Sequence, residues 1–169
     1  MLEKQVKIAF LSVGSNLGNK KKNIEKAKVL LNKNKIKIIK SSKNYETFSW
    51  PNKKNPKFIN IVLKVKTILS PNKLLNKCLY IEKTLGRIRK KKNEPRICDI
   101  DIIDYNGEVL HAYNNEILTL PHPEMHKRNF VLVPLFEISK SWVHPLKKAR
   151  IVNLLNSLKD KDLRAIKLI

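Results

Sequence analysis

Cysteine is scarce in this sequence, and long apolar runs are absent from it. Cys78 and Cys98 stand apart, with no metal-ligand spacing around either of them. A disulfide or a zinc site is therefore not expected, and both residues are predicted to be reduced thiols in the core or in a strand. No segment is apolar over the length that a bilayer requires, and residues 1–10 carry charges where a signal peptide would be apolar. These absences predict a cytoplasmic protein without a membrane partner.

Glycine is also scarce, and the common glycine-rich nucleotide motifs are missing. Gly14 and Gly18 lie in a GSNLG stretch that is similar to a phosphate loop. The stretch lacks the Gly-Lys-Ser/Thr ending of a Walker motif and the third glycine of a dinucleotide fingerprint. We therefore interpret it as a structural turn.

Acidic residues are few compared with basic ones. The chain has 36 Lys and Arg against 14 Asp and Glu, which gives a formal net charge of +22. Such a balance is typical of nucleic-acid-binding proteins. Here the excess is mostly lysine, spread along the whole chain and interleaved with asparagine and isoleucine, which indicates compositional drift rather than a selected groove. We therefore predict no specific nucleic-acid partner from the charge.

The order of the apolar segments predicts one α+β domain over residues 1–169. The order strand, helix, strand, strand, helix, strand is that of a ferredoxin-like βαββαβ fold, an antiparallel sheet with two helices packed on one face, followed here by a C-terminal extension. Ser70-Pro71 opens the second helix as a cap followed by proline. Strands are predicted at 6–13, 36–45, 58–67 and 97–105, and helices at 23–31, 71–85 and 151–158. Irregular structure with short helical pieces is predicted at 121–134, and Asn106-Gly107 is predicted to be a hairpin turn into 108–110.

Asp99 and Asp101 are the first candidate functional residues. Residues two apart in a strand project from the same face, roughly 7 Å apart, so both carboxylates face one way while Ile100 and Ile102 face the core. Two acids side by side repel each other unless a cation lies between them, and hard oxygen ligands suit Mg²⁺. Taken alone, the pair fits equally well as solvent-facing acids on an edge strand.

Three arginines just upstream favour the metal interpretation. Arg87, Arg89 and Arg96 are three of the chain's few arginines among many lysines, and the planar fork of arginine suits phosphate oxygens. Acids for a metal beside arginines for phosphate indicate a phosphoryl-transfer site, with a solvated basic loop as the alternative. His122 lies between two prolines with Arg128 close behind, a setting that suits a ligand contact or a turn residue.

Six segments, in order and spacing, together resemble the 6-hydroxymethyl-7,8-dihydropterin pyrophosphokinase family of folate biosynthesis. They are VGSNLGN (13–19), YET (45–47), FIN (58–60), IEKTLGRIR (81–89), PRICDIDII (95–103) and LPHPEMHKRNFVLVPL (120–135). The pattern PR-x-x-DIDI followed by PHP-x-M-x-x-R-x-F is highly specific. The resemblance implies an ATP-dependent diphosphotransferase that moves pyrophosphate from ATP to the hydroxymethyl group of the dihydropterin and releases AMP.

The resemblance also implies a role for each matching residue. Asp99 and Asp101 would bind two Mg²⁺ ions that bridge the ATP phosphates, and Arg89 and Arg96 would act with them in catalysis. The ATP-binding residues would be Glu82, Arg87, Arg89, Arg96, His122 and Arg128, with Glu82 helping to hold the nucleoside. The pterin-binding residues would be Thr47, Phe48, Phe58, Asn60 and Phe130, with Phe130 stacking on the ring and Asn60 pairing with its amide-like edge. A monomer is expected from the family.

Two other function classes fit parts of the sequence. A basic nucleic-acid-binding domain on a ferredoxin-like sheet would suit the charge and the fold, but such domains stack bases on exposed strand aromatics, and the predicted strands carry no such pair. A D-x-D metal-dependent sugar transferase would need a larger chain with a nucleotide-binding α/β half. The pyrophosphokinase is therefore the leading hypothesis.

Overall fold

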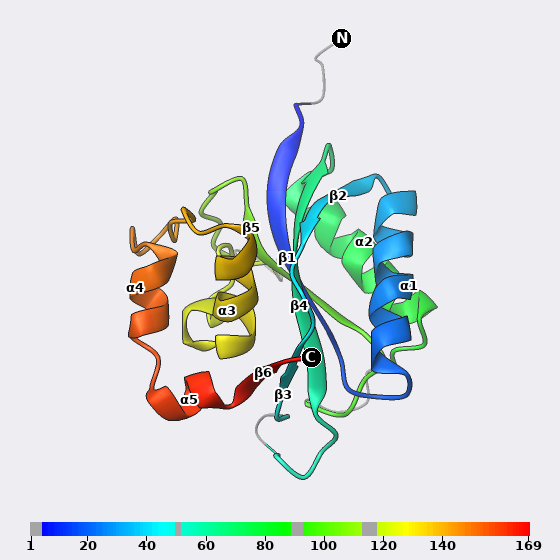
Figure 1. The fold of residues 1–169 in the computed structure, drawn as a ribbon. Helices are drawn as coiled ribbons and strands as arrows, with labels where there is room; N and C mark the ends of the chain where they lie inside the picture. The colour runs from blue at the N-terminus through cyan, green and yellow to red at the C-terminus, as the bar shows by residue number, and fades with distance from the viewer. Residues whose placement is uncertain (1–4, 50–51, 89–92, 113–117) are drawn as a thin grey trace.

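An antiparallel sheet runs through the middle of the molecule, with helices on both of its faces (Figure 1). The computed structural model describes residues 5–49, 52–88, 93–112 and 118–169. Along the chain the elements are β1 (Lys7–Ser15), α1 (Lys20–Lys33), β2 (Ile36–Ser41), β3 (Tyr45–Thr47), β4 (Phe58–Thr67), α2 (Pro71–Thr84), β5 (Asp99–Tyr105), the short 3₁₀ helix η1 (Met125–Lys127), α3 (Asn129–Ile138), α4 (Ile151–Asn156), α5 (Asp160–Arg164) and β6 (Ile166–Leu168). The predicted α+β class with an antiparallel sheet is confirmed.

The long strand β4 organises the sheet because it pairs along most of its length on both sides. β1 lies on one side of β4 and carries β5 on its other edge. β2 and β3 pair in succession with the opposite side of β4, and β6 adds to β3. The sequence predicts one strand over 36–45. The structure divides that segment into β2, which ends at Ser41, and β3, which begins at Tyr45. A register shift between Ile38 and Lys40 lies within β2.

Alternating side chains place one hydrophobic core on each face of the sheet. Ile59, Ile61, Ile100 and Ile102 face the core beneath α1 and α2. Both helices were predicted, and Ser70 is the N-cap of α2 with Pro71 in its first turn. Cys78 and Cys98 are buried free cysteines in this core, as predicted. Burial raises the pKa of both thiols, so neither is a ready nucleophile.

The second core lies on the other face, under α3 and α4 (Figure 1). The prediction of irregular structure over 121–134 was wrong from residue 129 onward, because α3 is a regular helix that contains Pro134. Burial of Val131, Leu132 and Leu135 against the sheet stabilises α3 despite the proline, whose missing N–H costs one helical hydrogen bond. This helix covers the face on which the candidate site lies.

Several predictions at the C-terminal side need smaller corrections. The turn at Asn106-Gly107 is present, but 108–110 does not return as a strand, and Leu110 instead forms an isolated bridge with Leu120. The helix predicted at 151–158 ends at Asn156. α5 and β6 were not predicted, since neither short segment has a periodic pattern long enough to reveal it. Within the described ranges, no helix is both long and apolar enough to cross a bilayer.

Candidate functional site

The candidate site lies at one end of the sheet, where three strands bring its residues side by side. Gly14 of β1 pairs with Asn60 of β4 on one side and with Asp99 of β5 on the other. Because the neighbouring isoleucines face the α1–α2 core, Asn60, Asp99 and Asp101 face the opposite side of the sheet. Adjacent strands are about 4.8 Å apart, so only the width of β1 separates Asn60 from Asp99.

Two arginines hold Asp99. Arg87 Nη1 donates to Asp99 Oδ1 at 2.5 Å, and Arg96 donates through Nε and Nη2 to Asp99 Oδ2 at 2.8 and 2.5 Å. Burial opposes ionisation of Asp99, but the charges and hydrogen bonds of Arg96 and Arg87 outweigh it and lower the pKa of the carboxyl group. Asp99 is therefore a carboxylate at neutral pH.

Asp101 is held far less tightly. Arg128 Nη1 lies 3.6 Å from Asp101 Oδ2, and 39% of the Asp101 side chain is exposed. Burial and the negative charge of Asp99 raise the pKa of Asp101, while Arg128 opposes the rise. The exposed part of the side chain lets water moderate this effect. Asp101 is thus an acid under electrostatic strain, and within the described ranges its one ion-pair partner is Arg128.

His122 lies beside Arg128, as the sequence spacing suggested. Arg128 Nη1 is 3.5 Å from His122 Nε2, and the backbone N–H of Glu124 donates to His122 Nδ1 at 3.1 Å. Burial and the charge of Arg128 lower the pKa of His122 to about 4, so the ring is neutral near neutral pH. Since Nδ1 accepts, the neutral ring carries its proton on Nε2. Two N–H donors therefore lie next to each other, an arrangement that favours an anion between them.

Glu82 supports this cluster from beneath. Its side chain is 2% exposed, its Oε1 atom lies 2.7 Å from Arg87 Nη1, and the same oxygen accepts from the backbone N–H of Ile100 at 2.7 Å. Glu82 thus connects the last turn of α2 to β5 between the two aspartates. Arg87 is shared by Glu82 and Asp99.

On the other side of β1, an amide and an aromatic ring form a second half of the site. Asn60 Nδ2 donates to Thr47 Oγ1 at 2.8 Å, and both residues are 5% exposed. Phe58 is partly buried, and the Arg96 guanidinium lies 4.9 Å from the centre of its ring. This cation–π contact joins the amide and aromatic half to the acid and arginine half.

The remaining predicted residues are less closely joined. Phe130 lies in the first turn of α3, and the Arg128 guanidinium lies 5.6 Å from its ring centre. Phe48 is 47% exposed, with the Lys57 ammonium 4.8 Å from its ring centre. The predicted catalytic residue Arg89 lies outside the described residues.

Asn16, for which no role was predicted, joins the two halves of the site through their loops. Asn16 Oδ1 accepts from the backbone N–H of Arg96 at 2.7 Å, and its Nδ2 donates to Ser49 Oγ and to the Pro56 carbonyl, each at 3.1 Å. The GSNLG stretch was interpreted as a structural turn. Its Gly14 and Ser15 are the end of β1, and the chain bends only at Leu17 and Gly18. The sequence feature that could have indicated a role for Asn16 is its position between two glycines at the end of a strand.

The donor set fits Mg²⁺ completed by ligand phosphates. Asp99 and Asp101 face the same side of β5, and their mutual repulsion is what a cation would relieve. Mg²⁺ needs only one or two carboxylates when water and phosphate supply the rest. Among the described residues, no three His, Cys, Asp or Glu side chains gather as a metal cluster.

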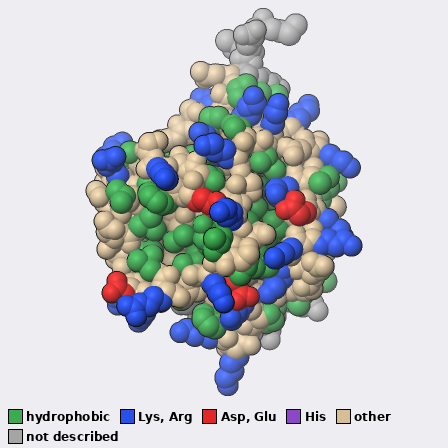
Figure 2. All heavy atoms as spheres, viewed as in Figure 1, with side chains coloured by type: hydrophobic (Ala, Val, Ile, Leu, Met, Phe, Trp, Pro, Cys, Tyr) green, Lys and Arg blue, Asp and Glu red, His purple; other side chains and the backbone are tan. Residues whose placement is uncertain are grey.

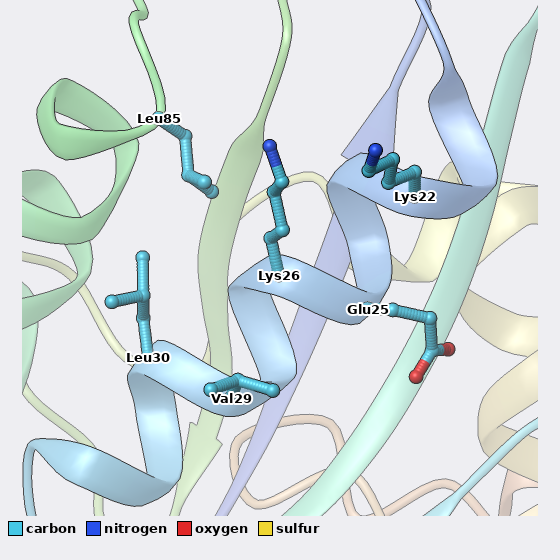
Figure 3. A pocket seen from close by; sticks show the side chains of 6 residues that line it. All are labelled: Lys22, Glu25, Lys26, Val29, Leu30 and Leu85. Atoms are coloured by element: carbon cyan, nitrogen blue, oxygen red, sulfur yellow. The ribbon is translucent and has the colours of Figure 1, made fainter.

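A separate hollow on the α1–α2 side carries none of this chemistry. It is lined by Lys22, Glu25, Lys26, Val29, Leu30 and Leu85 (Figure 3). Five of these residues come from α1, and Leu85 is the C-cap of α2. The hollow is apolar and open, and it lies on the face of the sheet opposite to the aspartates.

These observations define an α+β domain with paired carboxylates beside arginines, and with an amide and an aromatic ring one strand away. Acids beside arginines are the composition that phosphoryl-transfer proteins use to hold metal and phosphate. The family model described as "7,8-dihydro-6-hydroxymethylpterin-pyrophosphokinase (HPPK)" matches residues 10–140. The chain belongs to this family, as its motifs predicted.

Relatives of two kinds are similar to the chain. The folic acid synthesis protein fol1 of Schizosaccharomyces pombe is 39% identical over 159 residues, which are 94% of this chain and 21% of that protein. The 2-amino-4-hydroxy-6-hydroxymethyldihydropteridine pyrophosphokinase of Aquifex aeolicus is 39% identical over 141 residues, which are 81% of this chain and 83% of that protein. The chain therefore spans about a fifth of the fungal relative but most of the bacterial one.

Solved structures share the fold. The Plasmodium falciparum HPPK-DHPS wild-type structure matches with a TM-score of 0.73 at 17% identity, over 90% of this chain and 44% of that chain. An HPPK-DHPS structure in complex with substrates matches with a TM-score of 0.68 at 20% identity, over 90% of this chain and 43% of that chain. At these identities the likeness establishes the fold.

Proposed function

We propose that this chain transfers pyrophosphate from ATP to the hydroxymethyl group of 6-hydroxymethyl-7,8-dihydropterin, giving AMP and the pterin diphosphate, in folate biosynthesis. Family membership supports the proposal, since the bacterial relative is a pyrophosphokinase by name. The observation that carries it is the pairing across Gly14. Asn60 lies on one side and Asp99 on the other, so a pterin slot and a phosphate site would adjoin on one face.

The phosphate half would bind ATP through its basic residues. Arg87 and Arg96 already lie within hydrogen-bonding distance of an anion, the Asp99 carboxylate, and would exchange part of that contact for phosphate oxygens. His122 and Arg128 present two neighbouring N–H donors to the same region. Arg89 is proposed as a further ATP-binding and catalytic arginine on the resemblance alone, as is the contact of Glu82 with the nucleoside.

Asp99 and Asp101 would hold two Mg²⁺ ions, which when bound supply charge neutralisation and alignment of the triphosphate. The pterin half would bind the second substrate through Thr47, Phe48, Phe58, Asn60 and Phe130. The fixed Asn60 amide suits the amide-like edge of the pterin, and an aromatic ring suits its face.

The reaction requires no covalent enzyme intermediate. The hydroxymethyl oxygen of the pterin attacks the β-phosphorus in line and loses its proton to solvent. The bond between the β-phosphorus and the oxygen bridging to the α-phosphate breaks, and AMP leaves with that oxygen. Arginine side chains neutralise the charge on the transferred group, and the pterin slot orients the attacking oxygen, so catalysis is mostly positioning and electrostatic stabilisation.

Finer features of the molecule belong to the same proposal. The sheet order β5-β1-β4 with β2 beyond, and α1 and α2 on one face, supports a ferredoxin-like βαββαβ unit followed by a C-terminal extension. We propose one domain over residues 1–169, acting as a monomer in the cytoplasm. Its partners would be ATP and the pterin, with no specific nucleic acid and no membrane.

A product assay tests the function directly. Purified protein is incubated with ATP, Mg²⁺ and 6-hydroxymethyl-7,8-dihydropterin, and the products are separated by charge. AMP and pterin diphosphate are expected in equal amounts, and omission of the pterin should stop AMP formation. Appearance of ADP with a pterin monophosphate, or ATP consumption that does not depend on pterin, would contradict the proposal.

A further inference from the structure

Gly14 has no conformational reason to be glycine. The described glycines with positive φ are Gly18, Gly86 and Gly107, so the backbone of Gly14 is one that other residues adopt. It lies inside β1, in register with both neighbouring strands. The reason for glycine at this position must therefore be the absence of a side chain.

A side chain at this position would collide with the predicted pterin slot. A Cβ atom on Gly14 would lie 2.7 Å from Asn60 Oδ1 and 3.4 Å from the Phe58 ring carbon Cδ1. The first distance is shorter than any van der Waals contact and would force the Asn60 amide to move. The second is an ordinary close contact with the ring.

The Asn60 amide has little freedom to move aside. Its Nδ2 atom donates to Thr47 Oγ1, and both side chains are almost fully buried. Rotation away from β1 would break that hydrogen bond, and leaving it unmade in a buried setting is costly. The amide is thus held between Thr47 on one side and the bare backbone of Gly14 on the other.

We propose that Gly14 is a positioning residue of the pterin slot. Because Gly14 has no side chain, the Asn60 amide and the Phe58 ring can pack directly against β1. This inference rests on the proposed function. The three atoms nearest to the added Cβ belong to Asn60 and Phe58, and none of them belongs to Asp99. Gly14 therefore acts on the acceptor substrate and not on ATP.

The test is a double-mutant cycle on the full chain. The parent, Gly14→Ala, Asn60→Ala and the double variant are titrated with 6-hydroxymethyl-7,8-dihydropterin, followed by pterin fluorescence, with Mg²⁺ and α,β-methylene-ATP present. Affinity for the ATP analogue with Mg²⁺ is measured separately without pterin. Gly14→Ala should weaken pterin binding at least about tenfold and change ATP-analogue binding by less than about twofold, because a sub-ångström displacement of a positioning group is enough to lose much of its effect.

The double variant decides whether Gly14 acts through Asn60. Once Asn60→Ala has removed the amide, Gly14→Ala should cost little further pterin affinity, and the double variant should fold even where the single one does not. Equal pterin affinity of the parent and Gly14→Ala, or losses that multiply in the double variant, would overturn this inference while leaving the function in place. A parent that binds no pterin would overturn the proposed function and this inference together.

Discussion

The two aspartates of β5 differ in what they do for the folded chain. Asp99 forms ion pairs with both Arg87 and Arg96, whereas Asp101 has a 3.6 Å contact with Arg128 and is repelled by Asp99. Two residues apart on one strand, they look equivalent in the sequence. The positions of the arginines make Asp99 a structural ion-pair residue and leave Asp101 under electrostatic strain.

Asparagine substitutions should separate these roles. Asp99→Asn should lower the free energy of unfolding by about 1–3 kcal/mol, because two partly buried guanidinium groups lose the charge of Asp99. Arg87 keeps its ion pair with Glu82, and water screens part of the loss. Asp101→Asn should leave stability unchanged within about 0.5 kcal/mol, or raise it. Both variants should lose on the order of 100-fold or more in AMP formation at saturating Mg²⁺.

Urea unfolding without Mg²⁺ measures the stabilities, and the product assay measures the rates. Equal stability of the two variants would contradict the difference in role between Asp99 and Asp101. A near-parental rate for either variant would show that the substituted acid is not a metal ligand.

At the scale of elements, Glu82 fastens α2 to β5. Its buried carboxylate accepts from the Ile100 N–H and pairs with Arg87, so a helix end and the strand that carries both aspartates share one anchor. The register of β5 against β1 positions Asp99, but Glu82 supplies the contact from beneath the sheet. A buried acid at a helix end has no sequence pattern that would reveal this partner.

Two substitutions separate the hydrogen bond that Glu82 accepts from Ile100 from its ion pair with Arg87. Glu82→Gln keeps an oxygen for the Ile100 N–H and loses the charge facing Arg87, so it should cost about 1–2 kcal/mol of unfolding free energy. Glu82→Ala loses both and should cost about 3 kcal/mol or more. Glu25→Gln, which removes an exposed ion pair with Lys28, is the matched control and should cost less than about 0.5 kcal/mol. A cost for Glu82→Ala no larger than that of the control would show that α2 and β5 do not depend on this contact.

At the scale of the whole molecule, the basic residues behind the net charge of +22 are spread along the whole chain. Lys and Arg side chains are scattered across the face shown in Figure 2, with few acidic ones among them. Such a surface attracts any polyanion without selecting one. The drift interpretation therefore predicts weak binding of nucleic acid that is independent of its sequence.

Duplexes of two unrelated sequences should bind equally, with dissociation constants in the range of about 10⁻⁴ to 10⁻⁶ M at physiological salt. Affinity should fall steeply as salt rises, because binding releases counterions. Fluorescence anisotropy over a salt series measures both properties. Submicromolar, sequence-selective binding at physiological salt would instead support the nucleic-acid-binding alternative.

The sequence by itself determined the class, the family, the two helices on the first face and the side of the sheet that both aspartates face. These follow from period and motif, which are local: alternation in β5 places Ile100 and Ile102 in the core and so turns Asp99 and Asp101 away from it.

Tertiary structure alone decided the rest. Pro134 disfavours a helix at this position, and burial of α3 against the sheet outweighs that cost. The division of roles between Asp99 and Asp101, the anchor at Glu82 and the place of Gly14 beside Asn60 all depend on distances between segments far apart in the chain. Such distances are set by strand register and packing, which no local pattern encodes.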